Sequence, residues 1–308
     1  MKAEADHGWR LAADARNALG EGPVWCPQAQ ALWWIDVSVP SLWRLEAASG
    51  RVESWPLPKP PGTFALLEDG SILIAFRSGL ARFEPGAPLR WLDLPTLALG
   101  DDRFNDGKVD RAGRFWIGTM DRALTRPVGR LFRMDGLKRI DEVDAGFALS
   151  NGIGWSPDNR AMYFAETYEQ RIYRYDFDLA TGRASNRRVL VQLPDGHPDG
   201  LTVDAQGGIW CALFEAGRID RYRADGSLDR SLATPVSRPT SCMFGGPGLG
   251  TLYVTTARHG LSDAQLAAQP WAGGVIAIDV AEHGIAEPRM VEHAADGSLA
   301  RSPSTSIS

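Results

Sequence analysis

The chain has 308 residues, of which 44% are hydrophobic and 23% charged, a composition typical of a soluble globular protein. Its net charge of −5 comes with no basic block, which excludes the electrostatic footprint of a nucleic-acid-binding or membrane-surface protein. No apolar run approaches the roughly 20 residues that span a bilayer, and the first ten residues lack the apolar centre of a secretory signal. We therefore expect a cytoplasmic protein with no obligate protein partner. Its three widely spaced cysteines should be free thiols.

Six segments, taken in chain order, share one pattern, in which a short apolar run is followed by small or polar residues and a second, alternating run. The runs are short and β-prone, as in Leu-Trp-Trp-Ile and Arg-Ile-Tyr-Arg-Tyr, and turn sequences such as Glu-Asp-Gly at 68–70 separate them. Equivalent positions of the six segments are Trp33, Leu73, Trp116, Tyr163, Trp210 and Tyr253. Several strands recurring every 45 residues or so predict an all-β, six-bladed β-propeller. The alternative is a β-sandwich whose spacing is a coincidence.

The six units fill the chain as a single domain, which we expect to span residues 9–293. Residues 1–8 then form an N-terminal extension, and the Ser-rich tail 294–308 is expected to be disordered. Strand candidates at Trp9–Ala15 and Glu287–His293 flank the repeats. We expect these two ends to complete one blade, because that would remove an exposed sheet edge.

A side-chain oxygen precedes the apolar run of four segments by nearly the same distance. The offset is 10 or 11 residues for Glu21, Asn105, Asn151 and Asp199. At the entry to the innermost strands, these positions should face the central channel, where two carboxylates and two amides suit one hard divalent cation, calcium best of all. Each tripeptide alone is typical of a turn, so the shared offset carries the prediction. The other two segments offer Gly62 and Ser241, which predicts an open sector of the channel.

The chain resembles the regucalcin (senescence marker protein) and gluconolactonase family of six-bladed propellers from about residue 20 to residue 279. The resemblance is carried in order by the motifs LGEGPVW, FNDGKVD, GRFWIGTM, SNGIGWSPD, HPDGLTVD and FGGPGLGTLYVTTAR. It implies hydrolysis of a sugar lactone, such as glucono-, xylono-, arabinono- or galactonolactone, to the aldonic acid. It further implies a metal ion bound by Glu21, Asn151 and Asp199, with Asn105 as a further ligand or substrate contact. Arg103 would contact the substrate, and members of the family accept calcium, zinc, manganese, magnesium or iron.

The resemblance also implies that Asp199 is the general base, although it could instead only orient the attacking water. Family members carry an acidic substrate contact soon after the GTM motif, where this chain has Asp121, Arg122 and Ala123. Asp121 is the candidate for that contact at a shifted register, the alternative being that the contact is absent here. His197 is a further candidate to line the pocket, the alternative being a loop histidine that only hydrogen-bonds locally.

Functions of other classes remain open from the sequence. The same metal centre could serve a metal-dependent esterase or organophosphate hydrolase, or a calcium-binding protein without turnover. A pure binding platform of the WD-repeat kind would not need oxygen ligands that converge on its axis.

Overall fold

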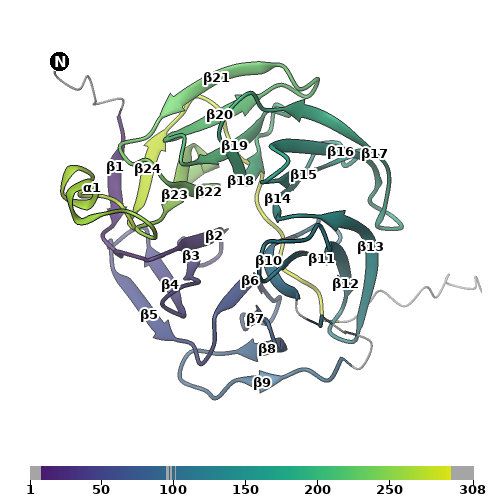
Figure 1. The fold of residues 1–308 in the computed structure, drawn as a ribbon. Helices are drawn as coiled ribbons and strands as arrows, with labels where there is room; N and C mark the ends of the chain where they lie inside the picture. The colour runs from purple at the N-terminus through teal and green to yellow at the C-terminus, as the bar shows by residue number, and fades with distance from the viewer. Residues whose placement is uncertain (1–7, 95–96, 98, 101, 293–308) are drawn as a thin grey trace, which may run out of the picture.

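The computed structural model describes residues 8–94, 97, 99–100 and 102–292. Its strands form six four-stranded antiparallel sheets arranged as blades around a central axis, so the predicted six-bladed propeller is confirmed (Figure 1). In each sheet, the strand closest to the axis packs against the corresponding strands of the neighbouring blades. It is called the inner strand here, and the strands of a blade are counted outward from it. All six aligned aromatic or leucine positions fall in the second strand of a blade, as the repeat predicts.

The strand bounds follow the blades from the axis outward. Blade 1 has β2 (Gly20–Cys26), β3 (Ala31–Asp36), β4 (Ser41–Glu46) and β5 (Val52–Pro56); blade 2 has β6 (Pro61–Leu66), β7 (Ile72–Phe76), β8 (Gly79–Phe83) and β9 (Arg90–Trp91). Blade 3 has β10 (Asp102–Val109), β11 (Phe115–Asp121), β12 (Gly129–Asp135) and β13 (Arg139–Phe147); blade 4 has β14 (Ser150–Trp155), β15 (Ala161–Glu166), β16 (Arg171–Asp178) and β17 (Arg183–Gln192). Blade 5 has β18 (His197–Val203), β19 (Ile209–Phe214), β20 (Arg218–Tyr222) and β21 (Leu228–Ala233); blade 6 has β22 (Pro239–Gly245), β23 (Thr251–Thr256), β24 (Val275–Asp279) and β1 (Arg10–Ala13).

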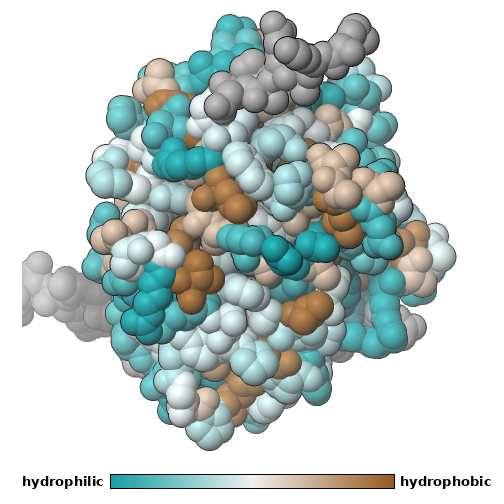
Figure 2. Space-filling view, turned by 90° about the vertical axis from the view of Figure 1, so that its left-hand side faces the viewer, coloured by the Kyte–Doolittle hydropathy of each residue, from teal (hydrophilic) through white to brown (hydrophobic). Residues whose placement is uncertain are grey.

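Burial explains the sequence of each blade. Second strands are apolar on both sides because they pack between neighbouring blades, and β7 and β15 are buried at every position. Outer strands alternate, as in β5, and leave one side chain in two exposed. Accordingly, hydrophobic residues form small separate groups on the side of the molecule where β1 and α1 (Asp263–Ala268) lie (Figure 2). Within the described residues, no helix is long and apolar enough to cross a membrane. The three cysteines are free and buried, as expected.

The ring is closed by the N-terminal strand alone, which corrects half of the prediction for the chain ends. β1 pairs with β24, in a register that sets Arg10 opposite Ala277. The segment from Glu287 forms no ladder in the described residues. It makes single backbone contacts with several blades, and Met290 bridges only to Leu67. In blade 6 the place beside β24 is already taken by β1, so this segment cannot complete the blade there. His293, the extension (except Gly8) and the tail lie outside the described residues.

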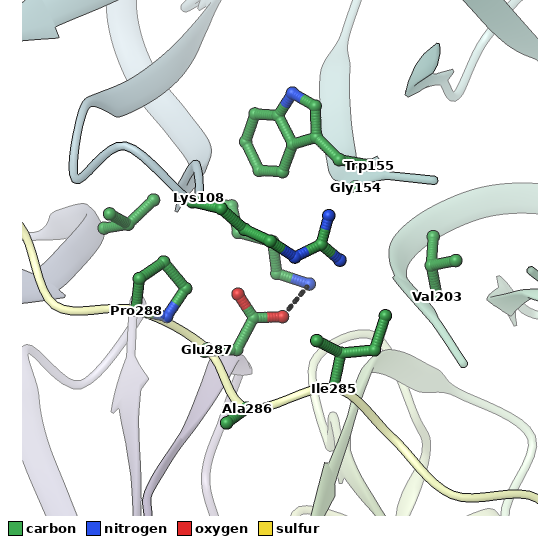
Figure 3. Close-up of a pocket in the computed structure, with 10 residues that line it drawn as sticks. Lys108, Gly154, Trp155, Val203, Ile285, Ala286, Glu287 and Pro288 are labelled. Carbon is green, nitrogen blue, oxygen red and sulfur yellow. Dashed lines mark ion pairs between the residues drawn. The ribbon is translucent and has the colours of Figure 1, made fainter. Parts of the chain in front are cut away.

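The segment after β24 instead crosses the propeller as a strap, defined here as residues 280–292 (Figure 1). It contacts the turns that follow the inner strands, through Leu249, Ala205 and Gly113. Beneath the central channel, Glu287 of the strap points toward Lys108 of β10, with 3.4 Å between Oε1 and Nζ (Figure 3). The Lys108 ammonium also donates to the Leu201 carbonyl at 3.0 Å. The strap therefore covers the end of the channel at which the inner strands finish.

Candidate functional site

Each inner strand is interrupted by a β-bulge near its beginning. The register with the second strand shifts between Glu21 and Val24 in blade 1, and equivalent shifts occur in all six blades. A bulge takes a residue out of the ladder and re-aims its side chain. Four of the bulges contain the predicted oxygen ligands or directly adjoin them. The shared sequence offset therefore corresponds to a shared backbone irregularity at the channel mouth.

The bulges open into a cavity of about 260 Å³ at this end of the channel. Six of the seven predicted site residues line it, namely Glu21, Arg103, Asn105, Asn151, His197 and Asp199. Apolar side chains, among them Met120, Leu149 and Phe214, complete its wall. A concave pocket whose apolar walls surround a set of convergent polar groups is a common form of a small-molecule site.

The two asparagines are held by a chain of hydrogen bonds. Asn105 Nδ2 donates to Asn151 Oδ1 at 2.9 Å, and Asn151 Nδ2 donates to the Thr167 hydroxyl at 2.7 Å. The Thr167 hydroxyl in turn donates to the Pro198 carbonyl at 2.8 Å, one residue before Asp199. Thr167 thus links two blades beneath the site. The sequence analysis missed it, because only the fold brings Thr167 to the start of β18.

The carboxylates of the cavity suit a cation. Burial, helped by the neighbouring Asp106, raises the pKa of Glu21 to about 8, against the opposing effects of the Gly22 amide and Arg103. Burial, then Glu21 and Asp106, raises the pKa of Asp199 well above its usual range. Asp199 Oδ1 is moreover buried without any hydrogen-bond partner. A buried carboxylate oxygen of this kind is costly unless something positive binds it.

The ligand types fit a hard cation of the calcium kind. No group of three or more His, Cys, Asp or Glu side chains in the described part of the chain is arranged to hold a metal. The candidate set here differs, because two of its four members, Asn105 and Asn151, are amides. Glu21, Asn151 and Asp199 are the residues that would hold the ion, with Asn105 beside them.

Two acidic residues at the ends of second strands fix the approach to the site. Asp36 accepts hydrogen bonds from the amides of Ala18 and Leu19, just before Glu21. Glu166 accepts equivalent bonds from the amides of Ala148 and Leu149, just before Asn151. These carboxylates therefore set where the inner strands of blades 1 and 4 begin. An acid that closes the short first apolar run of a segment, in WWID and YFAE, is the sequence signal for this role.

Asp121 does not join the other predicted site residues. Its side chain is buried and its Oδ2 accepts hydrogen bonds from the amide and hydroxyl of Thr125, at 3.0 and 2.9 Å. Oδ1 accepts from Arg126 at 3.1 Å, and these bonds hold the pKa of Asp121 well below its usual range. Asp121 therefore organises the turn after β11, and this geometry does not support the predicted substrate contact.

His197 stands at the edge of the cavity. Its ring meets Tyr168 edge-on, with 6.2 Å between the ring centroids, and Nδ1 lies 3.5 Å from the Thr167 carbonyl. Tyr168 is half exposed. Together they form an aromatic rim of the cavity that Asp199 also lines, where a ligand's hydroxyl groups could be contacted.

Fold and site together define a six-bladed propeller with a polar, cation-suited cavity at one end of its central channel. Residues 19–258 match the family model described as SMP-30/Gluconolactonase/LRE-like region, and the chain belongs to this family. It is 37% identical to the 6-deoxy-6-sulfogluconolactonase of Pseudomonas putida, over 88% of this chain and 94% of that one. It is 38% identical to the L-arabinolactonase of Azospirillum brasilense, over 91% and 94%. Among solved structures, the calcium-binding protein regucalcin of Agrobacterium tumefaciens strain C58 superposes with a TM-score of 0.86 at 30% identity, over 92% and 96%.

Proposed function

We propose that residues 9–293 form one catalytic domain that hydrolyses a sugar lactone to its aldonic acid with the help of a divalent cation. The observation that carries the proposal is the convergence of Glu21, Asn105, Asn151 and Asp199 on one cavity, with a buried carboxylate oxygen of Asp199 left unpartnered. The names of two relatives, an arabinolactonase and a sulfogluconolactonase, support the reaction class. Calcium is the favoured ion by ligand type, before zinc, manganese, magnesium or iron.

The chain's own residues divide the work of lactone opening. When bound, a divalent cation polarises the lactone carbonyl and stabilises the charge that develops on its oxygen. Asp199 is placed to hold the attacking water and accept its proton, because its free Oδ1 faces no competing donor. Arg103 has donors to spare for the substrate's oxygens, since within the described part of the chain its guanidinium donates only to the Phe104 carbonyl, at 3.2 Å. His197 and Asn105 are placed to contact the sugar hydroxyls.

The proposal is tested by lactone hydrolysis, followed as proton release. Chelator-treated protein is assayed with glucono-, xylono-, arabinono- and galactonolactone, with and without each divalent cation. We expect activity to return with the cation and to fall by about 10²- to 10⁴-fold in Asp199→Asn. Asp225→Asn, at an exposed turn of blade 5, is the matched control and should keep full activity.

Two outcomes separate the competing functions. Tight cation binding without hydrolysis of any lactone, but with hydrolysis of an aryl ester or phosphotriester, would replace this proposal by a broader metal-dependent esterase. Tight calcium binding with no turnover of any of these substrates would instead favour a calcium-binding protein.

A further inference from the structure

A second, larger cavity of about 570 Å³ adjoins the first. Leu19 and Arg103 line both cavities, so the two spaces meet at these side chains. The second cavity lies over blade 2, whose inner strand carries Gly62 at its bulge and therefore sends no side chain toward the axis. A Cβ at Gly62 would lie 2.2 Å from the Phe104 carbonyl oxygen, so the close packing of β6 on β10 requires glycine here.

The polar lining of this second cavity is cationic. It contains Arg77, Arg103, Arg122 and His259, and no acidic residue among the side chains that line it. Arg77 and Arg122 are exposed, and neither takes part in an ion pair or a side-chain hydrogen bond with any described residue. This is unusual for a chain of net charge −5, in which ion pairs engage many other arginines.

Three acids close in sequence to lining residues, Asp36, Asp102 and Asp121, are already engaged elsewhere. Asp102 pairs with Arg130 at 3.2 Å, and Asp121 is bound by Thr125 and Arg126. The Asp36 carboxylate accepts hydrogen bonds from four backbone amides, those of residues 18, 19, 38 and 39. Arg103 interacts electrostatically with Glu21 of the first cavity, whereas Arg77 and Arg122 form no ion pair with a described acidic residue.

We infer that this cavity binds an anionic group on the substrate, a sulfonate, phosphate or carboxylate carried by the lactone at a distance from its ring ester. The inference rests on the proposed lactonase function and names the substrate class within it. Arginine forks bind such groups through paired, charge-assisted hydrogen bonds. Because Arg103 lines both cavities, an anion held by Arg77 and Arg122 would belong to the same molecule that reaches Asp199.

The test compares kcat/KM of the cation-loaded enzyme for gluconolactone and for gluconolactones bearing a sulfonate, phosphate or carboxylate at C6. We expect at least one anionic lactone to be preferred, and its identity names the group that the cavity takes. In the double variant Arg77→Gln/Arg122→Gln, the ratio of anionic to neutral kcat/KM should fall about 10- to 100-fold, the loss expected for charged hydrogen bonds. Arg90→Gln/Arg188→Gln removes the same charge from two exposed, ion-paired arginines of outer strands and should leave the ratio unchanged.

The possible failures are distinguishable. Equal kcat/KM for neutral and anionic lactones, with a ratio that the Arg77/Arg122 variant does not change, overturns the inference and leaves the lactonase proposal intact. If no lactone is hydrolysed, the proposed function fails. Calorimetric titration with methanesulfonate and inorganic phosphate then tests separately whether the second cavity binds anions. Binding that weakens in the double variant supports an anion site, and no binding overturns it.

Discussion

Replacing Thr167 with valine removes one hydroxyl from beneath the site and leaves its shape nearly unchanged. That hydroxyl accepts from Asn151 Nδ2 at 2.7 Å and donates to the Pro198 carbonyl at 2.8 Å. Both bonds are buried, and Thr167 itself is 6% exposed. In Thr167→Val the Asn151 amide keeps only the hydrogen bond that its Oδ1 accepts from Asn105, so the orientation of the amide at the cavity is less well fixed.

The expected magnitude follows from the two lost bonds. Each is worth about 1 kcal/mol, and partners behind a metal ligand typically contribute about 10- to 100-fold in metal affinity. We therefore expect calcium binding to weaken by about that factor in Thr167→Val, measured by calorimetric titration against a competing chelator. Thr167→Ser keeps the hydroxyl and should bind nearly as the parent does.

The control separates orientation from general destabilisation. Thr251→Val removes another buried threonine hydroxyl, which donates to Asp279 at 2.6 Å in blade 6, away from the cavity. It should lower the free energy of unfolding without changing calcium affinity. If Thr167→Val binds calcium as tightly as Thr167→Ser, then Thr167 does not position the ligand and the reasoning is refuted.

Two further predictions concern pH and the strap. Because the pKa of Glu21 is raised to about 8, the folded, cation-free protein keeps a proton on this carboxyl that the unfolded chain releases near pH 4.5. The free energy of unfolding of the cation-free protein should therefore fall between about pH 5 and about pH 8. Urea unfolding in a chelator should reveal this slope, and it should shrink in Glu21→Gln. Lys108→Met leaves the partly buried Glu287 carboxylate without its ion-pair partner and should cost about 1–3 kcal/mol of unfolding free energy, while Lys108→Met/Glu287→Met should recover much of it.

Each of these has a contradicting result. A cation-free protein whose stability is flat over this pH range, or an unchanged slope in Glu21→Gln, would mean that Glu21 is ionised in the folded state. A double variant no more stable than Lys108→Met would mean that the Lys108–Glu287 pair does not account for the loss.

The sequence was sufficient for the blades and for most of the cavity because both repeat. An offset shared by Glu21, Asn105, Asn151 and Asp199 survives in the linear chain, since equivalent bulges occupy equivalent blades. Features that occur once have no such signal. The end of the strap was predicted as a strand because a short apolar run does not indicate whether a sheet edge is available to pair with it.

Single contacts across the fold were missed for the same reason. Asp121 was predicted as a pocket residue from its motif, yet its carboxylate accepts hydrogen bonds from the turn that follows it. Thr167 follows an ordinary apolar run, and its partner at Pro198 lies in the next blade. Such pairings depend on distances between blades, which local patterns do not encode.

The pairing of β1 with β24 also constrains how the molecule is assembled. β1 leaves the ribosome first, but the strand that completes its hydrogen bonds is synthesised only after all the other strands of the sheets. Until then, one blade has an open edge and the first strand has no permanent neighbour. Joining the two is a contact between distant parts of the sequence, the kind that slows folding. The ring can therefore close only after β24 has been synthesised, and a chain interrupted before Val275 would leave the edge of its last blade unpaired and open to other strands.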